Sequence, residues 1–256
     1  MPELADRLLD YWVAGYRPAD ELVGDDFDFV AMAGEDFTFL AGHHTERDSF
    51  FLFHNRAAVW DGPETPPFVA LHITRDPDAR TFRFGASGHP LVPLAQGWLI
   101  GRGCPPEDTV VSNADGPRPA DTLTTSLETW LRTNPGGRYE VLEHHNRTWE
   151  SWTLIRDSHP DAAKAPYRLF LDKVSRPSHT YTLREGAFPT PEEAADWLAD
   201  PSLPFPYASA PAGVRAEAAL TRSPQPQSRY AAPPDPVVEP RPTAPTATAR
   251  PGRGRS

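Results

Sequence analysis

The chain has 256 residues, of which 39% are hydrophobic, and it includes seven Trp and thirteen Phe. This composition excludes a chain that is disordered throughout and predicts one or two packed domains. The net charge is −10; residues 221–256 carry +4, so residues 1–220 carry −14. Because an acidic body repels phosphate backbones, its surface is a poor candidate for nucleic-acid binding.

Cysteine content and hydropathy bear on the cellular compartment. Cys104 is the single cysteine, which excludes an internal disulfide and a multi-cysteine metal site. The sequence has no run of 18 apolar residues, and its first residues lack the basic and apolar regions of a secretory signal. We therefore expect a cytoplasmic protein without a membrane partner.

Two segments about a hundred residues apart present the same motifs in the same order. Each has a His-His pair, a hydrophobic strand, a Pro-aromatic pair, a Thr-aromatic pair and a Trp-Leu pair. Residues 81–99 and 180–198 align without a gap. This duplication predicts an α+β fold made of two similar helix-covered antiparallel sheet units.

The first unit is predicted to span residues 1–113. Apolar residues at helical spacing predict a helix over 2–14. The alternation in Asp26-Phe27-Asp28-Phe29-Val30 predicts a strand, and similar patterns predict strands at 37–40, 49–53, 68–74 and 81–86. A helix over 91–102 is expected to end at Gly103.

The second unit is predicted to span residues 114–205 and to repeat this order. Asp121 or Thr122 caps a helix, and Thr190-Pro191-Glu192-Glu193 is a capping box that opens the last helix. Between them, strands are predicted at 138–143, 151–156, 167–174 and 179–183.

The composition changes near residue 206. Residues 201–256 hold thirteen prolines, and Tyr230 is the only aromatic residue beyond Leu220. Such a segment cannot bury a core, so residues 206–256 are predicted to form a disordered Pro/Arg-rich tail. Its arginines could make weak contacts with nucleic acid, although a solubilising role is the simpler interpretation.

The doubled histidine pairs are the candidate metal ligands. His43, His44, His144 and His145 would supply imidazole nitrogens if the two units brought one member of each pair together. Adjacent residues in a strand point to opposite faces, so neither pair can chelate through both rings. Exposed histidines at hairpin ends are the interpretation that we favour.

Two groups of residues suggest a hydrolase. Ser87 and His89 lie between a predicted strand and a predicted helix, where a nucleophile belongs, but His89 replaces the second glycine of Gly-x-Ser-x-Gly. An acidic cluster on the predicted first hairpin, from Asp25 to Asp36, could do acid and base chemistry or form a solvated face. The cluster contains Asp25, Asp26, Asp28, Glu35 and Asp36.

The loop from Trp60 to Pro67 is the candidate contact for a ligand or a partner. It combines an aromatic residue, the carboxylates Asp61 and Glu64, and rigid prolines, and long loops on a scaffold often carry function. His89 joins Trp60, Asp61 and Glu64 as a candidate binding residue. No cofactor is predicted, because the glycines lack the spacing of a phosphate-binding loop.

Residues 138–200 resemble an uncharacterised short domain that occurs, sometimes in tandem, in proteins of high-GC Gram-positive bacteria. The resemblance is carried by Trp152-Thr153-Leu154 and by Phe188-Pro189-Thr190-Pro191-Glu192. It implies a tryptophan-bearing strand, further antiparallel strands and a helix that starts at Thr-Pro. It implies no activity, and the first unit departs from it, with Pro90-Leu91-Val92-Pro93 at the helix start.

The sequence contains no complete catalytic constellation. Our leading hypothesis is therefore a non-enzymatic binding module that recognises a protein partner or a small ligand. A hydrolase and a nucleic-acid-associated protein are the alternatives.

Overall fold

The computed structural model describes residues 12–59, 62–111, 116–133, 137–200 and 203–206. All of them belong to one compact unit. Among the described residues, no helix has the length and hydrophobicity needed to cross a membrane. The predicted tail and residues 2–11 of the predicted first helix lie outside the described residues, whereas Trp12 and Val13 are helical.

The first half of the described chain forms a five-stranded sheet. Its strand order is β1-β5-β4-β3-β2, with β1 parallel to β5 and the other pairs antiparallel. The strands are β1 (Arg17–Pro18), β2 (Phe37–His44), β3 (Asp48–Asn55), β4 (Phe68–Asp76) and β5 (Thr81–His89).

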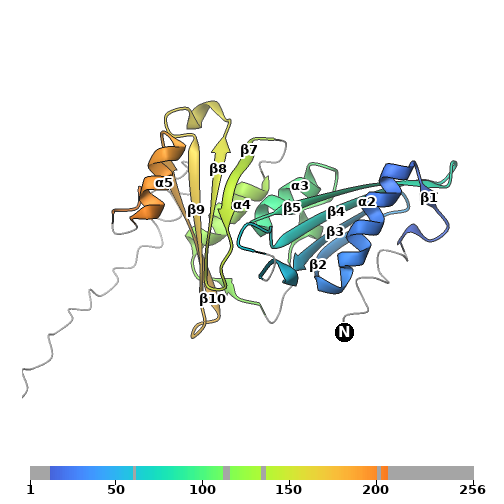
Figure 1. Ribbon diagram of the computed structural model, residues 1–256, viewed down its shortest axis with the longest axis horizontal. Helices are drawn as coiled ribbons and strands as arrows, with labels where there is room; N and C mark the ends of the chain where they lie inside the picture. Colours follow the sequence, from blue (N-terminus) through green and yellow to red (C-terminus); the bar gives the residue numbers. More distant parts are fainter. Residues whose placement is uncertain (1–11, 60–61, 112–115, 134–136, 201–202, 207–256) are drawn as a thin grey trace, which may run out of the picture. The chain divides into compact units, whose positions relative to one another are not determined.

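Two helices pack on opposite faces of this sheet (Figure 1). Phe51 and Phe53 of β3 face α2 (Glu21–Met32), whereas Phe50 and Leu52 face the side of α3 (Val92–Ile100). Strand alternation produces this division, and β3 is hydrophobic on both faces because both are covered. Burying each of these side chains contributes about 1.5–3 kcal/mol.

The predicted strand at residues 26–30 is wrong, because these residues belong to α2. Asp20 caps the helix by accepting a hydrogen bond from the Val23 amide at 3.0 Å. Phe27 is buried and packs in the core, whereas Phe29 is 72% exposed. The alternation of Asp and Phe fits a strand locally, but the cap and the spacing of Val23, Phe27 and Val30 favour a helix.

The second half repeats the first, with a sheet of order β6-β10-β9-β8-β7. Its elements are β6 (Arg118–Pro119), α4 (Thr122–Thr133), β7 (Tyr139–His145), β8 (Glu150–Asp157), β9 (Tyr167–Ser175), β10 (Thr180–Phe188) and α5 (Pro191–Ala199). The four longer strands and both helices were predicted. Thr190 caps α5 as expected, since its hydroxyl accepts a hydrogen bond from the Glu193 amide at 3.2 Å. The two-residue strand β6 was missed.

The two sheet units also share details of backbone geometry at equivalent positions. Arg80 and His179, at equivalent hairpin turns, are the two described non-glycine residues with positive φ. The amide of Arg17 bonds to the carbonyl of Arg80 in the first unit, and that of Arg118 bonds to the carbonyl of His179 in the second. Both edge strands, β2 and β7, carry an irregularity at equivalent positions.

Helix α3 packs against both units. On one side it covers the first sheet, and on the other Leu91 and Leu94 join the second core with Leu127, Leu131 and Phe170. Apolar residues therefore occur all round this helix, as expected for a helix buried on every side. A Cβ on Gly97 would lie 3.3 Å from the Arg132 carbonyl oxygen, so glycine allows α3 to approach α4.

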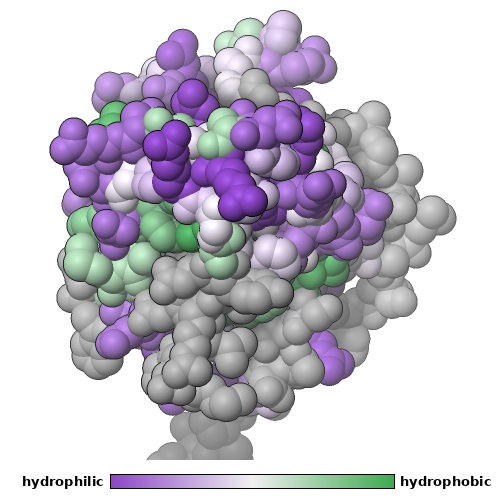
Figure 2. All heavy atoms as spheres, turned by 90° about the vertical axis from the view of Figure 1, so that its right-hand side faces the viewer, coloured by the Kyte–Doolittle hydropathy of each residue, from purple (hydrophilic) through white to green (hydrophobic). Residues whose placement is uncertain are grey.

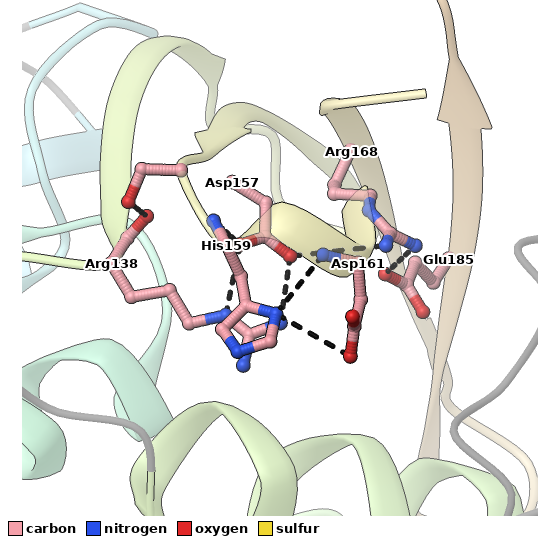
Figure 3. A network of polar contacts seen from close by, with 7 residues as sticks. Arg138, Asp157, His159, Asp161, Arg168 and Glu185 are labelled. Carbon is pink, nitrogen blue, oxygen red and sulfur yellow. Dashed lines mark hydrogen bonds and ion pairs between the residues drawn. The ribbon is translucent and has the colours of Figure 1, made fainter. Parts of the chain in front are cut away.

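The second unit holds a buried charge network that is not found in the described part of the first unit (Figure 3). Arg138 donates two hydrogen bonds to the Asp157 carboxylate, at 2.8 and 2.9 Å, and Arg168 donates one to Glu185 at 3.0 Å. Asp157 is 2% exposed. Burial raises the pKa of Glu185 to about 7, with Arg168 acting in the opposite direction. The first unit has neutral residues at three of these positions, Asn55, Val69 and Ala86.

Candidate ligand-binding cavity

A cavity of about 400 Å³ lies where α3 meets the start of β7. This volume is at the lower end of the range of small-molecule sites. We call it the α3 cavity. Its lining residues are Ser87, Gly88, His89, Leu94, Gly97, Trp98, Gly101, Arg102, Leu131, Gly137, Tyr139 and Val141.

Strand β5 carries two of the lining residues, Ser87 and His89. Phe82 and Phe84 of this strand pack in the core beneath α2, so the alternate residues point to the face that α3 covers. Trp98 of α3 lies above Gly85, where a Cβ would approach the indole to 4.0 Å. His89 then meets Trp98 edge to face, with ring centroids 6.3 Å apart.

His89 is neutral at physiological pH. Burial, together with the charge of Arg102, lowers its pKa to about 4. Its Nε2 atom is buried and has no hydrogen-bond partner within the part of the chain that the structure describes. An unsatisfied buried polar atom costs about 1–3 kcal/mol, so a ligand that reached this nitrogen would recover part of that cost.

Tyr139 contributes a second polar atom without a partner. Its ring packs against Trp130, with centroids 5.3 Å apart, and its hydroxyl is buried without a hydrogen bond to any described residue. Burial raises the pKa of this phenol, so the hydroxyl stays protonated and can donate as well as accept.

Arg102 brings positive charge to the exposed end of the cavity. Its guanidinium lies 3.4 Å above the Trp98 ring, and Nη1 donates to the Trp98 carbonyl at 3.3 Å. The arginine side chain is solvent-exposed and keeps further donors, which suit an anionic group.

The cavity thus contains both residues of the first hydrolase hypothesis, Ser87 and His89. None of its lining residues is a carboxylate, so nothing in the wall can orient His89 as a base in the manner of a triad.

Three of the residues that line this cavity were not found from the sequence, namely Trp98, Arg102 and Tyr139. The spacing of four between Trp98 and Arg102 on a predicted helix was a usable signal, because such residues lie side by side. Tyr139 gave no local signal, since its place beside residues 87–102 depends on long-range packing.

The predicted loop site lies partly outside the described residues, which exclude Trp60 and Asp61. Glu64 belongs to a turn near the end of β7, where the Asn146 amide donates to the Pro63 carbonyl at 2.7 Å. This part of the loop contributes a contact between the two halves.

The histidine pairs lie at the ends of β2 and β7, and all four rings have other contacts, which for His144 are with the backbone of Glu64 and Thr65. His43 bonds to Asp108 at 2.8 Å, His44 stacks on Trp12 at 3.8 Å, and His145 stacks on Trp152. Among the described residues, no group of three or more His, Cys, Asp or Glu is placed to hold a metal ion. The metal site stays a prediction.

The acidic cluster does not lie on a hairpin. Asp25, Asp26 and Asp28 belong to α2, and Glu35 and Asp36 belong to the 3-10 helix η1 (Ala33–Asp36). All five side chains are exposed, which corresponds to the solvated alternative.

A second hollow of about 520 Å³ lies beside the β9–β10 hairpin. Arg176 lies 3.6 Å above the Trp149 ring there. None of the buried polar atoms that lack a partner belongs to its lining residues, so it offers less to a polar ligand than the α3 cavity does.

Comparison of the chain with family models, curated proteins and solved structures gave no match.

Proposed function

We propose that the protein is a binding module that holds a small ligand in the α3 cavity without changing it chemically. The observation that carries this proposal is that His89 and Tyr139 both line the α3 cavity and that each has a buried polar atom, Nε2 and Oη, without a partner among the described residues. Two such atoms are costly in a protein without a ligand, and a ligand that satisfies both recovers that cost.

The chemistry of the lining defines the ligand class. A neutral imidazole and a protonated phenol favour a neutral group with both donor and acceptor atoms, such as an amide. Arg102 at the exposed end favours a carboxylate or another anion. Leu94 and Trp98 supply apolar contact between these polar groups. The expected ligand is a small acid that carries an amide.

N-acetyl amino acids are suitable probes, and their uncharged N-acetyl amino acid amides are matched comparators. We expect the acids to raise the melting temperature of the full chain, because a ligand that binds only the folded state stabilises it. Arg102→Gln should abolish the preference for the acids over the amides. Equal shifts for both probe series with the wild type would contradict the assignment of Arg102.

Tyr139→Phe tests the proposal even before the natural ligand is known. Removing an unsatisfied hydroxyl should leave the free energy of unfolding unchanged or raise it by about 1 kcal/mol, while probe binding weakens at least tenfold. Tyr181→Phe is the control, because the Tyr181 hydroxyl donates to Glu128 and its loss should destabilise the protein. A loss of stability in Tyr139→Phe together with unchanged probe binding would reject the proposed function.

A further inference from the structure

Helix α2 has an apolar outer face in addition to its buried one. Leu22 is 70% exposed, Phe29 72% and Met32 75%, although all three are large hydrophobic residues. Their spacing of seven and three places them on one side of the helix, opposite Phe27 in the core, and Asp25 lies among them on that side. We call these three residues the α2 stripe. Figure 2 shows this side of the molecule, where hydrophobic patches interrupt a hydrophilic surface.

The equivalent helix face in the second unit, on α4, is partly buried. Leu123 and Trp130 of α4 occupy the positions of Leu22 and Phe29, counted from the capping residues Asp20 and Asp121. Both pack against the core cluster to which α3 contributes Leu94. The same face of the same helix is therefore partly buried against a core cluster in one unit and exposed to solvent in the other.

The charge of α2 indicates what kind of partner its exposed face would fit. Helix α2 carries Glu21, Asp25, Asp26 and Asp28 and no basic residue. None of these carboxylates forms an ion pair within the described ranges. A surface that repels anions and presents an apolar stripe fits a partner with apolar side chains between basic ones.

A second copy of the chain fits this surface poorly. The element of that copy equivalent to α3 is α5, which carries Glu192, Glu193 and Asp196 and no basic residue. Its approach to α2 would bring like charges together. Two copies of α2 would repel each other for the same reason, because each carries carboxylates and no basic residue.

We propose that the α2 stripe and its acidic border bind an amphipathic helix of a partner protein, one with an apolar face flanked by lysine or arginine. This interaction surface is separate from the α3 cavity and does not depend on the proposed function of that cavity.

The first test uses the full chain and a fluorescent 18-residue peptide designed as an amphipathic helix with a leucine face and arginine flanks. We expect saturable binding by anisotropy that weakens as salt rises, because ion pairs at a surface are screened. Leu22→Ser combined with Phe29→Ser should weaken binding at least tenfold. Val110→Ser, which changes a hydrophobic residue that is 51% exposed elsewhere, should leave it unchanged.

A charge exchange makes the test specific. Asp25→Lys combined with Asp28→Lys should abolish binding of the arginine-flanked peptide and create binding of an otherwise identical glutamate-flanked peptide. All substituted positions are exposed, so circular dichroism should show unchanged folding. Hydrogen exchange should place the peptide-induced protection on residues 21–32.

Four results would overturn the proposal. Peptide binding that survives Leu22→Ser with Phe29→Ser would place the site elsewhere, as would protection outside α2. If the charge exchange fails to switch the peptide preference, the partner does not need basic residues beside its apolar face. A dimer that the same double variant dissociates would assign the stripe to a second copy of the chain.

Discussion

Three equivalent core positions carry opposite chemistry in the two sheet units. Under α2 they hold Phe27, Ile73 and Phe82, and under α4 they hold Glu128, Asp172 and Tyr181. The ring contact between Phe27 and Phe82, at 5.1 Å, thus corresponds to the hydrogen bond from Tyr181 to Glu128. The fold is the same with the apolar residues and with the polar ones, because the strands and the cap position the backbone in the same way.

Asp172 should make the stability of the protein fall as pH rises. Burial, with the nearby Glu128 carboxyl, raises its pKa to about 6, whereas the unfolded value is 3.8. Between these values the folded state binds a proton that the unfolded state has released, so stability is lost as pH rises from about 4 to 6. Urea unfolding should show Asp172→Asn more stable than the wild type by about 2 kcal/mol at pH 7.5 and almost equal at pH 4.

Asp196→Asn, on the exposed side of α5, is the control for this comparison. It should follow the wild type at both pH values. An Asp172→Asn variant that is less stable than the wild type at pH 7.5 would show that the ionised carboxylate is stabilising.

At the scale of elements, the contact of α3 with α4 depends on Gly97. A Cβ at this position would lie 3.3 Å from the Arg132 carbonyl oxygen, and a helix backbone cannot move away as a flexible side chain can. Gly97→Ala should therefore lower the free energy of unfolding by about 1–2 kcal/mol, even though alanine favours helices. Gly85→Ala, whose Cβ would meet Trp98 at 4.0 Å, should be neutral. Equal stability of both variants would mean that the helices can separate without cost.

The buried network of the second unit predicts a larger effect. Asp157→Asn copies Asn55 of the first unit but leaves Arg138 and Arg168 with one carboxylate fewer. Breaking a buried pair from one side typically costs 3–5 kcal/mol, and we expect about 3 kcal/mol by chemical denaturation. Glu140→Gln alters the exposed pair with Arg156, 4.0 Å apart, and should change stability by less than about 0.5 kcal/mol. A small effect of Asp157→Asn would show that solvent reaches the network.

Sequence patterns identified the elements whose signals are local. Thr190 was identified as a cap, and Asp121 as one of two candidates beside Thr122, because a cap needs only the following turn. The gapless match of 81–99 with 180–198 revealed the duplication. The strand predicted at residues 26–30 failed because alternation in five residues does not separate a strand from an amphipathic helix.

The site was predicted only in part for a related reason. Ser87 and His89 follow the predicted strand at 81–86 and were recognised as candidates from the chain order, although β5 in fact extends to His89. Tyr139 reaches the same cavity through the packing of α3 on the second unit, which no short pattern encodes. Arg168 stands in a predicted strand and Glu185 just beyond the end of one, and the sequence does not show that they form a pair.

At the scale of the molecule, the two units should unfold together. Leu94 is 9% exposed and belongs to the core of the second unit, although it is part of the helix that covers the first. Leu94→Ala should destabilise the protein by about 2–4 kcal/mol and keep a single calorimetric transition. Hydrogen exchange should show faster opening in both β4 and β9.

Leu142→Ala, at a position on β7 that is 41% exposed, serves as the matched control and should have little effect. Two separate transitions in the Leu94→Ala variant, with protection lost in β9 alone, would show that the units are independent.

The shared position of α3 has a consequence for synthesis on the ribosome. Leu94 leaves the ribosome before Phe170, its partner in the second core, and roughly 75 residues separate them, which takes about 4–15 s at usual elongation rates. During that interval the first sheet can form with one side of α3 exposed. A nascent chain of this protein therefore presents a hydrophobic helix face to chaperones until the second half emerges and covers it.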